Sequence, residues 1–545
     1  MGSRKLIRIG IIGGGPKGLY TYLRIAHLAR KNPGVSVRVT IFEPQNKIGC
    51  GIAYNTKQPA FLLMNYCNFH INFNEFLIEV GLASLKSYKD FIQKKYNYSV
   101  PEFNTAFSPR SYVGEYLNYL FEEGMRVSSG NLQTDIVREV ANEIKTSETG
   151  YAISTASKKV INVDKICLTT GHGSSINQPA LIYPISRILH TDLSGKIVKC
   201  KGIGLTFIDF VIASTEGNGG IYDLENDSYI PSGKEPKMII PFSRTNLPMI
   251  PRLSTILPHD YHSWKIGNAI KYILTEKKSD SLISFSDEIL PLIQDEMRFH
   301  YYRALLKDYG KVIPYSICKE HLESEISTFH KEYNVTAFSF YDLLFPHLTN
   351  NKKFIVEEYL EALFSHASMG FSSHFVSAIS VIRYVGPMIN ELLLTSSMDQ
   401  KSIDEFDRIW KSAFQRIAYG PPLINFKKLL IATRAGLVSW KSDLENYDVS
   451  FDCRITTTAC KNDMPYKSLI MRKMAISSGT NFDASRVNYL EIDNKGHIRN
   501  DHLSINDDII TYGIPAGAKT YNNDTLSPSY NNFTSNWLKK IFKKL

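Results

Sequence analysis

The most informative part of the sequence is a glycine-rich turn near its start. It reads Gly13-Gly14-Gly15-Pro16-Lys17-Gly18, between a stretch rich in isoleucine and a segment with helical period. In such a strand, turn and helix, Gly13 permits the tight turn, Gly15 lets the backbone approach a pyrophosphate, and Gly18 lets helix and strand pack closely. The N-H groups at the start of the helix then point at the anion. The turn therefore predicts a dinucleotide site.

The next strand supports this interpretation. Residues 35–42 alternate in period two and lead to Glu43, whose carboxylate can hydrogen-bond the ribose hydroxyls of an adenosine. Glu43 lies about 25 residues past Gly18, close to the ~20 residues typical of dinucleotide-binding folds. A glycine turn inside an α/β core that binds no nucleotide is the alternative.

A second, weaker turn of the same kind follows in Gly202-Ile203-Gly204-Leu205-Thr206-Phe207-Ile208-Asp209. It lacks a third glycine at the usual spacing, so a loop in a helical domain is the alternative. The strand after it, residues 237–242, leads to Ser243 and Arg244, with Arg252 nearby. An acidic side chain there would repel a 2′-phosphate, whereas an arginine pairs with it. The second turn therefore favours NADPH over NADH.

The rest of the chain divides by its periodicity. Residues 131–163 predict a small antiparallel meander. The strand that follows ends at Thr170, Gly171 and His172, at the edge where ligands bind in nucleotide-binding sheets. Residues 254–425 have helical period, and strands return near the end of the chain. The predicted fold class is α/β, with two Rossmann-like dinucleotide-binding domains and a helical insertion.

Composition narrows the range of partners. The net charge of +10 is spread along 545 residues, whereas nucleic acid requires a concentrated basic stripe, so nucleic acid is not predicted as a partner. Without an apolar run of about 18 residues, no stable membrane insertion is expected. The C-terminal stretch 537–545 has lysines opposite an apolar face, and docking on the core is favoured over lying on an anionic membrane. The sequence does not fix the oligomeric state.

The cysteines and histidines predict a protein without disulfides and without a metal site. The seven cysteines are odd in number, scattered and without a CxxC pair, which favours reduced thiols and a cytoplasmic location. His259 and His262 are closely spaced, but they form a lone HxxH pair. Such a pair favours a surface turn over a zinc site, and no metal is predicted.

Eight motifs occur in order between about residues 5 and 250: Gly13-Gly-Gly-Pro-Lys-Gly18, Phe42-Glu43-Pro, Gly49-Cys-Gly51-Ile-Ala-Tyr54, Leu62-Leu-Met-Asn65, Ser108-Pro-Arg110-Ser-Tyr-Val-Gly114-Glu-Tyr116-Leu, Thr169-Thr-Gly171-His172, Gly202-Ile-Gly-Leu-Thr-Phe-Ile-Asp209 and Phe242-Ser-Arg244. Together they resemble the flavoprotein family of FAD-dependent urate hydroxylases and aspartate N-monooxygenases. A looser likeness is Tyr512-Gly513-Ile-Pro-Ala-Gly517. Thr458-Ala-Cys460-Lys461 departs from the family's Cys-Thr-Gly turn, and the residues after Arg244 depart from its second arginine.

The resemblance implies a domain assignment and a set of cofactor contacts. Residues 1–195 and 450–545 would bind FAD, through the residues of the first turn and Glu43, Gly51, Tyr54, Asn65, Arg110, Thr170, Gly171, His172, Gly513 and Gly517. Residues 196–253 and 426–449 would bind NADPH, through Gly202, Gly204, Leu205, Thr206, Asp209, Ser243 and Arg244. Residues 254–425 would be a helical insertion that sets substrate choice.

The activity implied by the resemblance is that of an FAD-dependent monooxygenase. NADPH would reduce FAD, and the reduced flavin would react with O2 to a C4a-hydroperoxide that hydroxylates a small-molecule substrate, with nitrogen as one target. Asn65 is the single catalytic candidate, because an amide near the flavin can hydrogen-bond the peroxide or the nicotinamide. An amide that caps a loop turn is the alternative. Two other functions stay open: a flavin dehydrogenase or oxidase, and a nucleotide-binding protein without redox activity.

Overall fold

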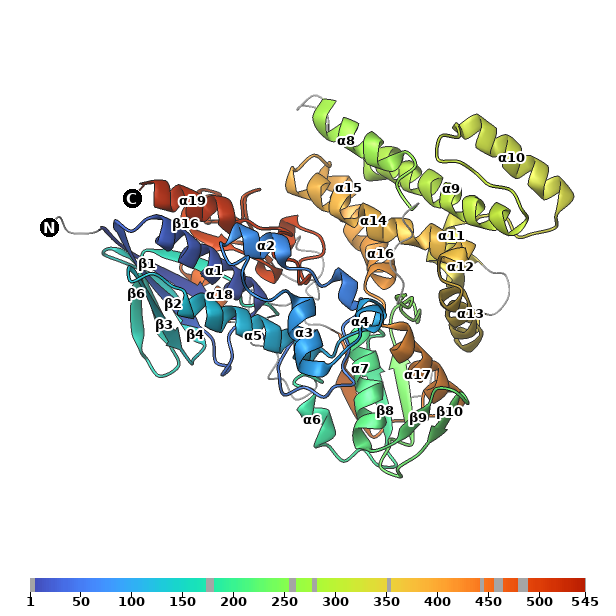
Figure 1. The fold of residues 1–545 in the computed structure, drawn as a ribbon, viewed down its shortest axis with the longest axis horizontal. Helices are drawn as coiled ribbons and strands as arrows, with labels where there is room; N and C mark the ends of the chain where they lie inside the picture. Colours follow the sequence, from blue (N-terminus) through green and yellow to red (C-terminus); the bar gives the residue numbers. More distant parts are fainter. Residues whose placement is uncertain are drawn as a thin grey trace.

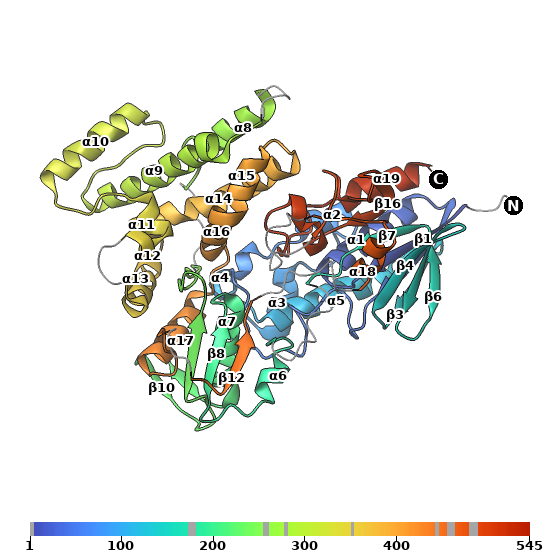
Figure 2. The same cartoon turned by 180° about the vertical axis from the view of Figure 1, so that it is seen from behind.

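The chain forms two parallel sheets and a separate helical segment (Figure 1 and Figure 2). The first sheet and its helices lie at one end of the molecule, and the second sheet and the helical segment lie at the other end. The computed structural model describes residues 5–172, 181–253, 261–276, 282–349, 354–441, 446–454, 464–478 and 489–544.

The first sheet contains six strands in the order β15-β16-β7-β1-β2-β3. β1 lies between β2 and β7, and neighbouring strands are parallel except β15 and β16. Ile9 and Ile11 of β1 are fully buried, as expected for a central parallel strand that is covered on both faces. The strands are β1 (Lys5–Ile12), β2 (Val35–Phe42), β3 (Leu132–Val137), β7 (Lys165–Leu168), β15 (His497–Arg499) and β16 (Ile505–Thr511).

Helices cover one face of the first sheet, and a small antiparallel sheet covers the other face (Figure 1). α1 (Pro16–Lys31) follows the first glycine turn and packs against α5 (Arg110–Arg126) and α19 (Thr534–Lys544). The antiparallel sheet lies so close that a Cβ at Gly10 of β1 would be 3.0 Å from the Ile153 side chain. Its strands are β4 (Ala141–Ser147), β5 (Gly150–Thr155) and β6 (Val160–Val163).

The second sheet has three parallel strands in the order β11-β8-β12. The predicted α/β class is thereby confirmed. The predicted domain boundary at residue 450 falls inside β12, which pairs with β8. The elements of this unit are α6 (Ser186–Leu189), β8 (Ile197–Lys201), α7 (Leu205–Ser214), the hairpin β9 (Ile221–Asp223) and β10 (Ser228–Ile230), β11 (Met238–Phe242), α17 (Leu423–Arg434) and β12 (Val449–Asp452).

The helical segment is built around two helices that pack along each other, α9 (Leu290–Asp308) and α14 (His374–Leu394). The apolar stripe of α14 is buried, including Ile379, Ile382 and Ile389. Its other helices are α8 (Ile266–Glu276), α10 (Lys319–Glu332), α11 (Phe340–Leu344), α12 (Pro346–Thr349), α13 (Val356–Ser368), α15 (Gln400–Glu405) and α16 (Lys411–Ala418). The remaining short elements are α2 (Asn74–Glu79), α3 (Tyr88–Tyr96), α4 (Val100–Thr105), α18 (Tyr466–Met471), β13 (Ser477–Ser478) and β14 (Tyr489–Leu490).

One local prediction is wrong. The sequence predicts an antiparallel meander over residues 131–163, whereas β3 pairs in parallel with β2 at the edge of the first sheet. Only β4, β5 and β6 form the antiparallel meander. Alternation along β3 marks a strand but does not choose its partner, because the choice depends on contacts with residues about 95 positions away.

The C-terminal helix α19 docks on the first unit, as the sequence favours. Its apolar side chains Trp537, Leu538 and Ile541 are buried, and the helix contacts α1. In the part of the chain that the structure describes, none of the helices has both the length and the apolar character that crossing a membrane requires.

Candidate functional site

The first glycine turn has the conformation that the sequence predicts. Gly13 has φ +104°, and its N-H donates to the Phe42 carbonyl oxygen at 3.0 Å. A Cβ at Gly13 would overlap the Thr169 carbonyl, and a Cβ at Gly18 would overlap the Gly13 carbonyl. The fold itself therefore requires glycine at both positions.

Gly15 is different, because no protein atom crowds it. Its φ is −71°, which any residue adopts, and a Cβ there would meet only the backbone of Gly51, at ordinary distances of 3.6 Å from Cα and 3.9 Å from N. The fold does not explain a glycine at this position. A ligand phosphate that lies against the backbone does explain it, as the sequence analysis proposed for the pyrophosphate.

Glu43 is buried at the end of β2 and holds the turn from the other side. Its Oε2 accepts from the Gly14 N-H at 2.8 Å, and its Oε1 accepts from the Gln45 N-H at 2.9 Å. Burial raises the pKa of the Glu43 carboxyl, while these two N-H groups oppose the rise. Each carboxylate oxygen has a second lone pair, so ribose hydroxyls can still donate to it.

The segment from Gly49 to Tyr54 lies against the first turn. The Gly49 N-H donates to the Gly14 carbonyl oxygen at 2.6 Å, and Gly51 has φ +54°. Gly114 on α5 leaves room for the Tyr54 carbonyl, which a Cβ at Gly114 would overlap. The role of Gly114 was not assigned from the sequence, because only the folded chain shows that carbonyl against α5.

Asn65 lies in the loop after this segment, partly exposed. Its side chain makes no hydrogen bond with any described residue, so the amide does not cap a turn there. Its predicted catalytic role stays a prediction. Gln58, seven positions earlier, donates from Nε2 to the Ile52 carbonyl at 2.7 Å and is the amide that ties this loop together.

The end of β7 completes the first site. Thr169 Oγ1 donates to the Gly13 carbonyl at 2.6 Å, a contact that the sequence analysis missed because it assigned only the following residues. Thr170 Oγ1 lies 2.5 Å from the Tyr466 hydroxyl. Gly171 has φ +66° with open space where a Cβ would point, and His172 is partly buried beside it.

The late segment at Gly513 reaches the same turn. Gly513 has φ +83°, and a Cβ there would lie 3.0 Å from the Lys17 side chain. Lys17 Nζ donates to the Ser527 carbonyl at 2.7 Å and lies 4.8 Å from the ring centre of Tyr512. Burial, and then the charge of Arg24, lower the pKa of Lys17 to about 7. At Gly517, a Cβ would overlap the Tyr489 ring, which explains that glycine by packing.

The second turn repeats the geometry of the first. Gly202 has φ +104° and donates from its N-H to the Phe242 carbonyl at 2.8 Å, just as Gly13 does to Phe42. Gly204 has φ −87° and open space where a Cβ would point, which matches Gly15. Phe207 stands where the third glycine is missing, and its ring is fully buried. The loop alternative for this segment is therefore not what the chain forms.

Ser243 and Arg244 follow β11 beside the second turn. The Ser243 N-H donates to Asn246 Oδ1 at 2.8 Å, and Ser243 Oγ accepts from the Asn246 N-H at 3.0 Å. Arg244 is exposed and pairs with no carboxylate among the described residues. A free guanidinium here is suited to a phosphate of a nucleotide bound at the second turn.

Both helices that follow the turns begin without a cap. Neither α1 nor α7 has a side chain that accepts from its first N-H groups, and neither has an acidic residue in its first turn. Helix N-termini normally obtain such partners from a side chain, water or a ligand. Two uncapped helix starts, each behind a glycine that no protein atom crowds, fit the phosphates of two nucleotides.

Arg110 and Asp209 are both occupied in a contact between the two sheet units. Arg110 on α5 donates to both carboxylate oxygens of Asp209 on α7, at 2.7 and 3.1 Å. Arg110 also donates to the Tyr183 hydroxyl at 2.7 Å and the Leu63 carbonyl at 2.9 Å. Burial, the largest single cause, lowers the pKa of Arg110, but the charge of Asp209, the Tyr183 hydroxyl and the hydrogen bonds to Asp209 together raise it, so the net pKa is raised. Their predicted cofactor contacts stay predictions, and the geometry assigns them to joining the units.

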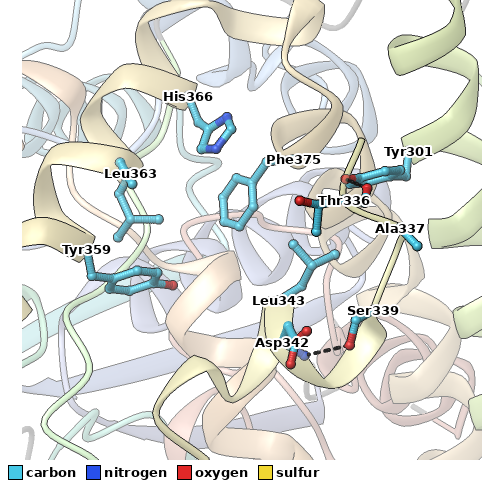
Figure 3. A pocket seen from close by; sticks show the side chains of 11 residues that line it. Tyr301, Thr336, Ala337, Ser339, Asp342, Leu343, Tyr359, Leu363, His366 and Phe375 are labelled. Carbon is cyan, nitrogen blue, oxygen red and sulfur yellow. Dashed lines mark hydrogen bonds between the residues drawn. The ribbon is translucent and has the colours of Figure 1, made fainter. Parts of the chain in front are cut away.

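A separate pocket of about 210 Å³ lies inside the helical segment (Figure 3). Its lining is largely apolar and comes from α9, α11, α13, α14 and the segment just before α11. Its polar groups bond locally: Ser339 Oγ accepts from the Asp342 N-H at 3.3 Å, and His366 Nδ1 lies 2.9 Å from Ser373 Oγ. It contains none of the predicted cofactor residues, so the two glycine turns define the candidate site.

Comparison with known proteins confirms the first turn as part of a cofactor domain. Residues 10–173 match the family described as FAD-NAD(P)-binding. The segment is similar to FAD-NAD(P)-binding domains. It contains the first turn, Glu43 and the end of β7, and the resemblance predicted from the motifs is confirmed for it.

Curated relatives extend the similarity beyond this domain. The chain is 25% identical over 338 residues to the nitrosuccinic acid synthase npaA of Aspergillus oryzae, covering 55% of this chain and 50% of the relative. It is 25% identical over 350 residues to an L-aspartate N-monooxygenase (nitrosuccinate-forming) of Streptomyces davaonensis, covering 55% and 53%. The chain spans about half the length of the curated relatives it matches.

Solved structures show a distant likeness over nearly the whole chain. The ornithine hydroxylase PvdA of Pseudomonas aeruginosa is 11% identical with a TM-score of 0.42, covering 98% of both chains. Cyclohexanone monooxygenase of Rhodococcus sp. Phi1, solved bound to NADP+, is 13% identical with a TM-score of 0.40, covering 99% of this chain and 84% of that one.

Two predictions fall wholly or partly outside the described residues. The turn at Thr458–Lys461, which departs from the family pattern, lies there, as does His259. The ring of the neighbouring His262 packs against Tyr315, with centroids 4.7 Å apart.

Proposed function

We propose that the protein is an FAD-dependent monooxygenase that uses NADPH and O2 to hydroxylate a small molecule at nitrogen. The observation that supports this most is the repeated turn: two glycines at φ +104°, each leading into an uncapped helix. One turn belongs to the FAD-NAD(P)-binding domain, and the second supplies a place for a second nucleotide. The names of the curated relatives give the class of reaction.

Each turn has a distinct task in this proposal. The backbone at Gly15 and the start of α1 would hold the pyrophosphate of FAD, while Glu43 accepts from the ribose hydroxyls. The backbone at Gly204 would hold the pyrophosphate of NADPH, with Arg244 paired to the 2′-phosphate. Bound FAD supplies the redox chemistry, accepting hydride from the nicotinamide and activating O2 for transfer to the substrate.

The chain's other residues orient the two nucleotides and limit water. Arg110 and Asp209 fix the second turn relative to the first through a bidentate ion pair, so the two nucleotides meet in a defined geometry. Buried Tyr20 and Tyr512 close the first site beside Lys17. We also propose a cytoplasmic location, which the free thiols of the described cysteines support.

The test is NADPH-dependent O2 uptake by the FAD-loaded protein, with and without L-aspartate as the first substrate. A monooxygenase consumes O2 faster with a substrate and releases a hydroxylated amine. Substrate turnover that continues without O2 would instead assign the protein as a dehydrogenase. Protein that takes up no FAD would exclude both enzymes and leave a nucleotide-binding role.

A further inference from the structure

Two arginines, Arg252 and Arg383, lie side by side at the end of α16. Figure 1 shows α16 on the side of the helical segment that faces the second sheet. Arg252 Nε donates to the Ala418 carbonyl at 2.9 Å. Arg383 Nε, from α14, donates to the Ile417 carbonyl at 3.2 Å, and its Nη2 donates to the Pro251 carbonyl at 3.4 Å. Arg252 and Arg383 thus donate to the carbonyls of consecutive residues, Ala418 and Ile417, and Arg383 also donates to the residue just before Arg252. The two guanidinium groups are therefore neighbours.

These carbonyl groups accept hydrogen bonds from only some of the N-H groups of each guanidinium. Ile417 and Ala418 end α16, and cations are favourable at the negative end of a helix. The bonds use Nε and Nη2 of each arginine and leave both Nη1 groups without a partner among the described residues. Each Nη1 carries two N-H donors. The pair therefore has donors to spare after the helix end is satisfied.

Neither arginine has a counter-charge in the part of the chain that the structure describes. Burial lowers the pKa of Arg252. Burial, and then the charge of Arg252, lower the pKa of Arg383 to about 9. Arg110, which like the pair is partly buried, shows the contrast, because the charge of Asp209 balances its own. Two adjacent cations without an acid are unfavourable unless an anion joins them.

The groups closest to the pair are neutral, and one acid, Asp524, lies beside Tyr419. Tyr66, Cys67 and Tyr419 lie near Arg252, and Tyr261 lies near Arg383. The Tyr419 hydroxyl is buried and forms no hydrogen bond of normal length with a described residue, although the Asp524 carboxylate lies nearby. An orphaned buried hydroxyl is unfavourable and indicates a missing partner. Tyr66 and Cys67 come from the loop that also carries Asn65, which places the pair beside the predicted flavin side of the first unit.

We propose that Arg252, Arg383 and the Tyr419 hydroxyl form a binding site for a carboxylate group of the substrate. This proposal rests on the proposed function, because it assigns the part of the chain that holds the molecule to be oxidised. Guanidinium groups bind carboxylates through paired N-H donors, and two of them confer a strong preference for an anionic ligand. The same chemistry would bind a nucleotide phosphate, but Arg244 already stands free beside the second turn for that purpose.

The test is calorimetric titration of the full-length, FAD-loaded protein with sodium succinate, without nicotinamide nucleotide. We expect wild type to bind succinate, and Arg252→Gln and Arg383→Gln each to bind it at least about tenfold more weakly, since each variant loses charged hydrogen bonds to the carboxylate. Tyr419→Phe should weaken binding about threefold to tenfold. Arg244→Gln is the matched control and should bind succinate as wild type does.

A parallel titration with NADPH separates the two sources of anion. We expect Arg244→Gln to weaken NADPH binding and Arg383→Gln to leave it unchanged. Thermal melting of each variant separates folding from binding, because glutamine retains a donor for the Ile417 carbonyl. Succinate affinity equal to wild type in Arg383→Gln, or loss of NADPH but not succinate in that variant, would overturn the proposal. Since no turnover is measured, succinate binding without O2 uptake would leave this site standing and reject only the proposed activity.

Discussion

Substituting alanine at Gly15 tests whether glycine is needed there to bind a ligand or to allow the chain to fold. The φ of −71° suits alanine, and its Cβ would meet only the backbone of Gly51, at 3.6 Å from Cα and 3.9 Å from N. Alanine is a poorer helix cap than glycine by about 0.5–1 kcal/mol, but it lowers the entropy of the unfolded chain by a similar amount. We therefore expect the free energy of unfolding of Gly15→Ala to change by less than about 0.5 kcal/mol.

The same methyl group occupies the space where the pyrophosphate of FAD would meet the backbone. Forcing one extra carbon into a filled site costs about 1–3 kcal/mol, so FAD should bind Gly15→Ala about fivefold to 150-fold more weakly. The assay is titration of the FAD-free protein with FAD, followed by flavin fluorescence quenching. Urea denaturation of the same FAD-free samples measures the stability.

Gly13→Ala is the matched control for this prediction. At φ +104° alanine is strained by about 1–2 kcal/mol, and its Cβ would also overlap the Thr169 carbonyl. Gly13→Ala should therefore lose both stability and FAD binding. The reasoning is refuted if Gly15→Ala binds FAD like wild type, or if it loses as much stability as Gly13→Ala.

Three other perturbations test separate parts of the site. Asp209→Asn leaves the buried Arg110 without its counter-charge and should lower the free energy of unfolding by about 3–5 kcal/mol, measured by urea denaturation; a loss below about 1 kcal/mol would contradict the interdomain ion pair. The pKa of Lys17 is about 7 in the folded protein and near 10.4 in the unfolded chain. Between these two pH values the unfolded chain binds more protons, so the free energy of unfolding without FAD should rise with pH across that window. Lys17→Met should flatten this rise, and a pH profile that Lys17→Met leaves unchanged would reject the lowered pKa of Lys17. Arg244→Gln should weaken NADPH about tenfold and leave NADH unaffected; equal losses for both nucleotides would show that Arg244 does not contact the 2′-phosphate.

Local pattern was sufficient for the parts of the site that are continuous in sequence. The first turn, α1 and β2 follow one another, and the glycine spacing specifies their geometry without reference to distant residues. The second turn was a weaker prediction from the sequence alone, because Phe207 stands in place of the third glycine. The structure shows that Gly202 and Gly204 are enough for the backbone to adopt the same conformation.

The contacts between distant segments could not be predicted from pattern. Arg110 and Asp209 are 99 residues apart, and only the packing of α5 near α7 shows that they bind each other. Arg252 and Arg383 meet through carbonyls of α16, so neither the sequence around one nor that around the other indicates the pair. The partner of β3 was mistaken for the same reason, since strand alternation is local and strand pairing is not.

The central claim is that electrons pass from a nucleotide at the second turn to a flavin at the first. Anaerobic mixing of FAD-loaded protein with NADPH, followed by flavin absorbance, tests it directly when wild type is compared with Gly204→Ala. A Cβ at Gly204 meets no protein atom, so this variant should fold, keep FAD and be reduced far more slowly at low NADPH. Equal reduction rates in the two proteins, or wild type that stays oxidised, would contradict the claim.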